Sequence, residues 1–303
     1  LKRDRASFLV SARRTWLDGV LWLGFLFADT DYAVGYNFYD LNVKVNWEAG
    51  ERDQLFLSFY NGRDSHFGEW ENAYNKKPDR TSFRWGNVSV AARWNHVFSS
   101  RLFSNVTLYY SRFNNNQCVT MFNTEADERD EARVNSHLED ATLKADFDWR
   151  LTDRHYLRFG GGVSRLHFLP EMSYLGSLQF KSRVRDSTAG AVSVVSLYAE
   201  DTWRVTRRLS VNAGLRLDAQ FTEGKTYVCL QPRLSAAYMA GRGAMLKAAW
   251  ARTQQPVHLL VNTSVGMNAD LWVPATERVA PSCGDLWTAG VSCAWESGWE
   301  VSA

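Results

Sequence analysis

The 303-residue chain contains no apolar run long enough to form a membrane-spanning helix. Its longest such run, from Val20 to Ala28, covers about nine residues, whereas a helix needs about 20 to cross a bilayer. The mean hydropathy of −0.34 is also low for a bundle of such helices. We therefore exclude a helical membrane protein, so any contact with lipid must come from apolar residues that alternate with polar ones.

Charge of either sign is not in excess. The chain has 35 basic and 33 acidic residues, which gives a formal net charge of +2. This balance favours neither a nucleic acid nor an acidic protein as a partner. The acidic run at 124–131 is interpreted as a solvated loop, with a cation- or ligand-attracting lid as the alternative.

Cysteine is scarce, and its spacing is uninformative. Cys118, Cys229, Cys283 and Cys293 include no CxxC pair of the kind that binds metal. If the segment between the last two is extended, they lie about 33 Å apart, whereas a disulfide needs Cα atoms about 5.5–6 Å apart. Any disulfide must pair them otherwise, and we expect free thiols.

No catalytic or metal-binding motif stands out. The six histidines show neither HxxxH nor HExxH spacing. His258, Ser264 and Asp270 lie in one loop-like region and could be imagined as the nucleophile set of a hydrolase, but nothing in the sequence fixes their geometry. We expect neither an enzyme nor a bound cofactor.

The chain starts without methionine or a signal peptide. It stops at Ala303, where another strand pattern is beginning. We expect an internal piece of a longer protein.

The region 193–221 shows the pattern that dominates the chain. From Val195 to Val205 the odd positions are mostly apolar and the even positions polar, and the alternation resumes after the turn-like 206–208. A period of two is what a β-strand with one apolar and one polar face requires. Each arm has about 11–13 residues, enough for a tilted strand to cross a bilayer. A long hairpin of a soluble sandwich would show the same alternation.

Short and long connections alternate strictly along the chain. Outer-membrane barrels have short periplasmic turns and long extracellular loops, whereas a sandwich has no reason to place its long loops at one end. We therefore predict an all-β fold, a transmembrane antiparallel β-barrel present in part, with about 12–13 strands. The turns fall near residues 50, 100, 153, 207, 242 and 297, and the polar stretches interpreted as loops are 63–82, 114–137, 168–190 and 256–285.

Tryptophan recurs at one depth of the predicted strands. On the apolar parity, a tryptophan lies within a few residues of each predicted short turn. Tryptophan prefers the membrane–water interface, where its ring is apolar and its N–H stays hydrated. We interpret six of them as part of an aromatic girdle: Trp47, Trp94, Trp149, Trp203, Trp250 and Trp295.

Charged side chains gather on the opposite parity, which would face the lumen. Mutual ion pairing across neighbouring strands explains most of them, and the functional alternative is docking of an internal domain or a hydrophilic path for solute. A wide barrel needs such a lining in either case. The candidates are Lys44, Lys144, Asp146, Asp148, Arg158, Glu200, Arg204, Arg216, Asp218, Arg233 and Lys247.

Three features depart from simple alternation. The apolar segment 16–28 is interpreted as a short helix folded over the barrel mouth, in preference to a strand extension. Asp201 interrupts the apolar parity near Trp203, where it is tolerated at the interface or bonded to a neighbouring strand. The run 160–162 of three glycines suits strand curvature or the close approach of an internal domain better than a phosphate loop.

One stretch resembles a known family. The segment SLYAEDTWRVTRRLSVNAGLRLD at 196–218 is similar to the Tyr-x-x-Asp-x-Trp hairpin and the Gly-Leu-Arg-x-Asp strand of TonB-dependent outer-membrane receptors. LQPRLSAAY at 230–238 resembles the Pro-Arg strand that follows in those proteins. Further similarity covers 8–18, 39–47, 93–111 and 270–282.

This resemblance implies a function and partners. It implies a barrel of about 22 strands in the Gram-negative outer membrane, of which 1–303 is one part, with a plug outside this sequence. The expected partners are outer-membrane lipid, the plug, TonB through the plug, and a surface lipoprotein, with no nucleic acid. Active import of a siderophore, cobalamin, glycan or peptide is the implied function. A passive channel is the first alternative, and a barrel hydrolase is the second.

Overall fold

The computed structural model describes residues 5–27, 32–71, 77–123, 128–175, 184–187, 190–241, 243–262, 269–294 and 300–302. Its elements are β1 (Ala6–Arg14), α1 (Leu17–Phe27), β2 (Tyr32–Glu48), β3 (Asp53–Glu71), β4 (Pro78–Ser99), β5 (Leu102–Asn123), β6 (Glu128–Arg150), β7 (His155–Leu175), β8 (Val184–Ser187), β9 (Gly190–Arg204), β10 (Leu209–Thr222), β11 (Lys225–Gly241), β12 (Ala244–Gln255), β13 (Val257–Asn262), β14 (Ala269–Pro274), β15 (Ser282–Ala294) and β16 (Glu300–Ser302).

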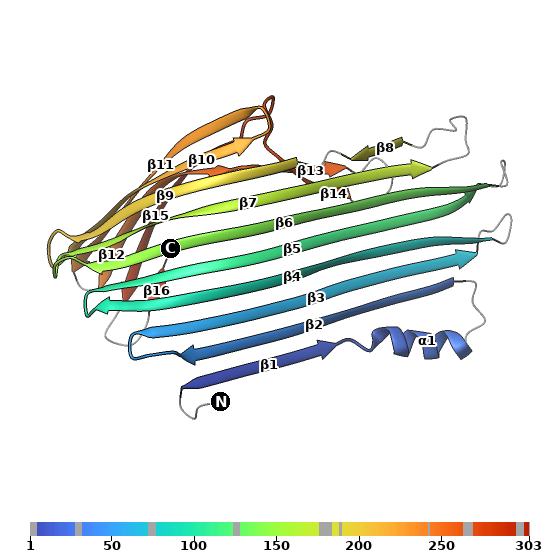
Figure 1. Ribbon diagram of the computed structural model, residues 1–303, viewed down its shortest axis with the longest axis horizontal. Helices are drawn as coiled ribbons and strands as arrows, with labels where there is room; N and C mark the ends of the chain where they lie inside the picture. Colours follow the sequence, from blue (N-terminus) through green and yellow to red (C-terminus); the bar gives the residue numbers. More distant parts are fainter. Residues whose placement is uncertain are drawn as a thin grey trace.

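One antiparallel sheet contains nearly all of these strands (Figure 1). The strands follow one another across the sheet from β1 to β16, except that β8 pairs with β7 and that β13 and β14 form a separate two-stranded sheet. The path does not close, because β1 and β16 are its two end strands. The predicted all-β fold, a partial antiparallel barrel, is confirmed.

The short turns lie together at one end of the long strands, as predicted (Figure 1). They join β2 to β3, β4 to β5, β6 to β7 and β9 to β10. The turn between β11 and β12 uses glycine for a physical reason: Gly241 and Gly243 have φ angles of 94° and 79°. A Cβ on Gly243 would also lie 1.9 Å from the carbonyl oxygen of Ala294, so only glycine fits.

The polar stretches at the other end are mostly strand and not irregular loop, so that part of the sequence interpretation was wrong. β3 continues to Glu71 against β4 from Pro78, and β5 continues to Asn123 against β6 from Glu128. β4 and β5 each have 22 residues and β6 has 23, about twice the 9–11 needed to cross a bilayer. Paired strands satisfy their backbone groups in water as well as in lipid, so the loss of apolar residues there does not end the sheet.

The register places the two residue parities on opposite faces. Trp47 pairs with Leu55, which pairs with Trp94 on the next strand, so all three lie on one apolar face. On β6 the apolar run extends from Trp149 to Ala141, about nine residues, close to what a tilted strand needs to cross a bilayer. Large apolar side chains on this face are exposed: Leu57 at 50%, Leu108 at 57% and Leu197 at 59%.

Buried side chains lie mainly on the other, polar face. They include Thr142, Asp148, Ser196 and Asp218, each less than a tenth exposed. Burial of polar groups and exposure of apolar ones is the inverse of a water-soluble protein. This distribution is typical of the wall of a membrane barrel, with its apolar face outward and its polar face inward.

The segment after β1 is helical, as predicted, and forms α1. The helix does not fold over the mouth: in Figure 1 it continues beyond β1 and lies beside β2, where Phe25 and Tyr32 meet edge to face at 6.1 Å. Within the described residues, no helix combines the length and the apolar character needed to cross a membrane.

The two faces of β11 give a direct test of this assignment. Leu234 is on the apolar face and its neighbour Ser235 is on the polar face. Leu234→Arg should cost about 2–4 kcal/mol of unfolding free energy, because it places a charge in lipid, whereas Ser235→Arg should cost much less. Urea unfolding of the full-length protein from lipid vesicles measures both values. Equal losses would contradict the lipid-facing assignment.

Candidate functional site

The polar face carries all of the predicted lumen-facing residues. Asp148 pairs with Arg158, which in turn pairs with Glu200 on β9, so three charged side chains form one row. Lys44, on the second strand, occupies the same face, because its neighbours Val43 and Val45 are on the apolar face. The remaining predicted residues on this face are Lys144, Asp146, Arg204, Arg216, Asp218, Arg233 and Lys247.

A network across β6, β7 and β9 begins at Asp146. Lys144 Nζ lies 3.3 Å from Asp146 Oδ2, and the Tyr198 hydroxyl donates to Asp146 Oδ1 at 2.8 Å. Tyr198 is on β9 and must reach across β7 to make this bond. It can do so because Gly160 is paired with both residues and has no side chain in the way.

The central glycine is therefore a steric requirement. A Cβ on Gly160 would lie 2.3 Å from the carbonyl oxygen of Ala145 and 3.1 Å from Cε1 of Tyr198. We predicted strand curvature or the close approach of an internal domain for the three glycines; for Gly160 the structure shows a further reason, the passage of a neighbouring aromatic ring.

The same network continues through Arg158. Its Nε lies 2.9 Å from Asp148 Oδ1, and its Nη1 lies 3.6 Å from Glu200 Oε1. The Tyr156 hydroxyl donates to Asp148 Oδ1 at 2.6 Å. Asp148 is 5% exposed, and these partners satisfy its hydrogen-bonding capacity in that buried position. A recess of about 330 Å³ opens over this network.

A second network joins β9, β10 and β11. Arg216 Nε donates to Asp218 Oδ1 at 2.9 Å, and Arg216 Nη2 donates to the Ser196 hydroxyl at 2.7 Å. Gln231 Nε2 donates to Asp218 Oδ2 at 2.7 Å. Most predicted lumen-facing charges are thus paired with one another. Arg158 pairs across neighbouring strands, as the simpler interpretation expected, whereas Lys144–Asp146 and Arg216–Asp218 are pairs within one strand.

Four predicted cations on the polar face differ from the rest. No hydrogen bond or ion pair joins them to any residue that the structure describes, and all four are exposed: Lys44, Arg204, Arg233 and Lys247. They leave positive charge on the polar face for a partner to neutralise.

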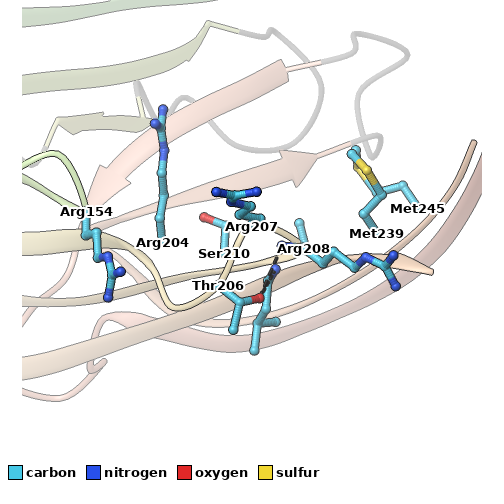
Figure 2. Close-up of a pocket in the computed structure, with 10 residues that line it drawn as sticks. Arg154, Arg204, Thr206, Arg207, Arg208, Ser210, Met239 and Met245 are labelled. Atoms are coloured by element: carbon cyan, nitrogen blue, oxygen red, sulfur yellow. Dashed lines mark hydrogen bonds between the residues drawn. The ribbon is translucent and has the colours of Figure 1, made fainter. Parts of the chain in front are cut away.

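Arg204 belongs to a basic recess at the end of the sheet that carries the short turns. The recess has a volume of about 560 Å³, and Met239 and Met245 line its apolar side. Arg204 shares the recess with Arg154, Arg207 and Arg208. Figure 2 shows that these four side chains point in different directions around it.

The hairpin of β13 and β14 was not predicted. It packs on the polar face at the long-connection end, where Val257 and Trp272 contact a cluster of buried side chains. Phe168 and Val192 in that cluster are fully buried. The sequence did contain a signal, since apolar residues replace polar ones on the lumen-facing parity there: Leu138, Leu166, Phe168, Val192 and Val194.

Four of the six predicted girdle tryptophans lie on the apolar face beside a short turn. Trp47, Trp94, Trp149 and Trp203 are between 38% and 49% exposed. Trp250 is also on this face but stacks on Trp287 at 5.5 Å. Trp295 lies outside the described residues.

Two aspartates hydrogen-bond to residues on neighbouring strands close to these tryptophans. His155 Nδ1 lies 2.6 Å from Asp201 Oδ2, so Asp201 is bonded to a neighbouring strand, one of the two predicted outcomes. At the turn before the apolar band, His96 and Trp94 hydrogen-bond to Asp53 and hold the pKa of that carboxyl below its usual value.

The imagined hydrolase set is not assembled by the described residues. His258 Nδ1 lies 3.3 Å from the hydroxyl of Ser282, which is a different serine. Ser264 lies outside the described residues, and Asp270 is paired in register with Val261. All four cysteines are free. Within the described residues, no group of three potential ligands could hold a metal ion.

The crossing of Tyr198 over Gly160 can be tested by substitution. Tyr198→Phe should cost about 1.5–3 kcal/mol of unfolding free energy, because it removes one hydrogen bond to a charged acceptor. Gly160→Val should cost more, since its side chain also collides with backbone. Ala199→Val, on the exposed apolar face, is the control for the added volume. Urea unfolding would contradict this account if Gly160→Val and Ala199→Val were equally stable.

The hairpin contact has its own test. Phe168→Ala should loosen the hairpin from the wall and speed tryptic cleavage after Arg278, because the buried ring is lost. Phe159→Ala, on the apolar face, should leave that cleavage rate unchanged. Equal cleavage rates in both variants would show that the hairpin does not depend on Phe168.

Comparison with solved structures supports the fold. The ferric pyoverdine-bound receptor FpvA of P. aeruginosa matches with a TM-score of 0.65 at 12% identity, over 90% of this chain and 41% of that one. The siderophore receptor PirA of Acinetobacter baumannii matches with a TM-score of 0.65 at 15% identity, over 98% and 46%. The RagAB peptide transporter matches with a TM-score of 0.56 at 8% identity, over 86% and 39%.

These likenesses show the fold alone, and the chain spans less than half the length of these three structures. Among curated proteins, no sequence matches. The family model described as TonB dependent receptor-like, beta-barrel matches residues 7–280. Proteins of that family are transport receptors of the Gram-negative outer membrane. The two-faced antiparallel sheet and this match over most of its length show that the chain belongs to the TonB-dependent receptor β-barrel family.

Proposed function

We propose that this chain is part of the wall of an outer-membrane receptor that imports a scarce solute with energy supplied through TonB. The proposal depends on one observation: the same sheet has two different faces. One face carries an exposed apolar band about one bilayer wide, and the other carries charged side chains, most of which pair with one another. A siderophore is the first candidate solute, since FpvA and PirA are siderophore receptors. A peptide is the second, since RagAB is a peptide transporter.

The unpaired cations support an internal partner. Three of these cations, Arg204, Arg233 and Lys247, lie on β9, β11 and β12 and face the lumen side without an acidic partner among the described residues. A polar plug with acidic groups would neutralise them, whereas a water-filled pore would leave them as a selectivity feature for anions. The plug and the TonB contact belong to the expected full-length protein.

Transport measurements separate the importer from a passive channel. We expect uptake of a ferric siderophore by cells that carry the full-length protein, and we expect it to stop when TonB is deleted or the proton gradient is collapsed. Uptake that persists without TonB and rises linearly with solute concentration would favour the passive channel.

The contribution of the three cations is tested in the same assay. Replacing Arg204, Arg233 and Lys247 together by glutamine should weaken plug docking and reduce TonB-dependent uptake several-fold, because each position would lose its ion pair with an acidic group of the plug. The control replaces Arg52 and Arg101, two exposed turn arginines, by glutamine and should retain uptake. Unchanged uptake in the triple variant would contradict a docking role.

A further inference from the structure

The continuous run of apolar residues on the outward face ends along one line across β3, β4 and β5, and beyond it only isolated apolar residues such as Phe67 follow on β3. Along β3, Leu57 and Phe59 are followed on the same face by Asn61 and Arg63. The same change occurs after Val88 on β4 and after Tyr110 on β5. The line lies toward the long-connection end, so it marks the edge of the lipid-facing band on that side.

A recess lies directly beyond this line, on the same outward face. Arg63 pairs with Gly86, which pairs with Asn114 on the next strand. Gly86 leaves a gap in that row, and the gap cannot be filled, because a Cβ there would lie 2.6 Å from the carbonyl oxygen of Gly62. The recess has a volume of about 320 Å³, and Arg84 and Tyr39 are also in its lining.

Two arginines of the recess are not neutralised. Arg63 and Arg84 are exposed and make no hydrogen bond or ion pair within the described ranges. The neighbouring Arg112 differs, since its Nη1 lies 3.4 Å from Glu139 Oε1 and its Nε donates to Asn114 Oδ1 at 3.0 Å. Net positive charge is therefore concentrated at Arg63 and Arg84.

We propose that this recess binds the phosphate group of a lipid in the outer leaflet. Arginine forks match phosphate oxygens in geometry and charge, and the Asn116 amide, in register with Arg84, can add a hydrogen bond. The acyl chains of the same lipid would lie along the exposed Val90 and Leu108 below the recess. The inference rests on the proposed outer-membrane location.

The position of the recess selects a lipid over a transported solute. Arg63 and Arg84 are on the apolar, outward face, on the opposite side of the sheet from the charged lumen networks. A solute that passes through the lumen does not reach them. The recess lies where the apolar band ends, which is the depth at which lipid headgroups begin.

The test uses the full-length protein in detergent and lipid A as the phosphate-bearing probe. Native mass spectrometry should show lipid A retained by the wild type, and Arg63→Gln with Arg84→Gln should raise its dissociation constant roughly thirtyfold, since each arginine near an anionic lipid contributes a factor of about five. Arg207→Gln with Arg208→Gln removes the same charge at the opposite end and should leave the constant unchanged. Heat-modifiable gel migration confirms that each variant is folded.

Three results would overturn the proposal. The first is equal binding of lipid A by the wild type and the Arg63/Arg84 variant, or none by the wild type. The second is equal affinity for dephosphorylated lipid A, which would assign binding to the acyl wall alone. The third is displacement of lipid A by equimolar inorganic phosphate, which would indicate a soluble-anion site. TonB-dependent uptake is measured separately, and its loss in the wild type would count against the proposed function and not against this site.

Discussion

Backbone pairing is the constraint on which the rest of this structure depends. In lipid no water is available to satisfy N–H and C=O groups, so a spanning sheet must pair them between strands without interruption. Once the register is fixed, every side chain is committed to one of two faces, and a shift by one residue would exchange the faces. The continuous pairing from β2 to β7, in which the register shifts between Val97 and Ser99 of β4, therefore sets which residues lie on the apolar face and which on the polar face.

The polar face shows how a lumen wall satisfies its own charges. Asp146 and Asp148 each receive a tyrosine hydroxyl as well as a cation, and Tyr198 reaches its acceptor only because Gly160 leaves a path over β7. Charges tied into such networks contribute rigidity and not free binding capacity. The residues available to partners are therefore the unpaired ones, such as Arg204 on the lumen side and Arg63 on the outward side.

Much of this arrangement was predictable because a two-residue period is local. The turns, the assignment of Trp94 and Trp149 to one face and the lumen-facing parity all follow from alternation alone. The strand extensions beyond the apolar band were mistaken for loops, because polar residues on both faces remove the only periodic signal. Apolar residues on the lumen-facing parity mark where the β13–β14 hairpin packs, but the packing of Trp272 against that cluster joins segments far apart in the chain, and no local pattern identifies that partner.

The most direct test of the two-faced wall is a scan of spin-label accessibility along 228–238 of β11 in the full-length protein, with the native cysteines replaced, in lipid vesicles. Accessibility to oxygen should oscillate with a period of two and peak at positions such as Val228, Leu230 and Leu234, since oxygen concentrates in lipid. A flat profile, or maxima at Gln231, Arg233 and Ser235, would contradict the account.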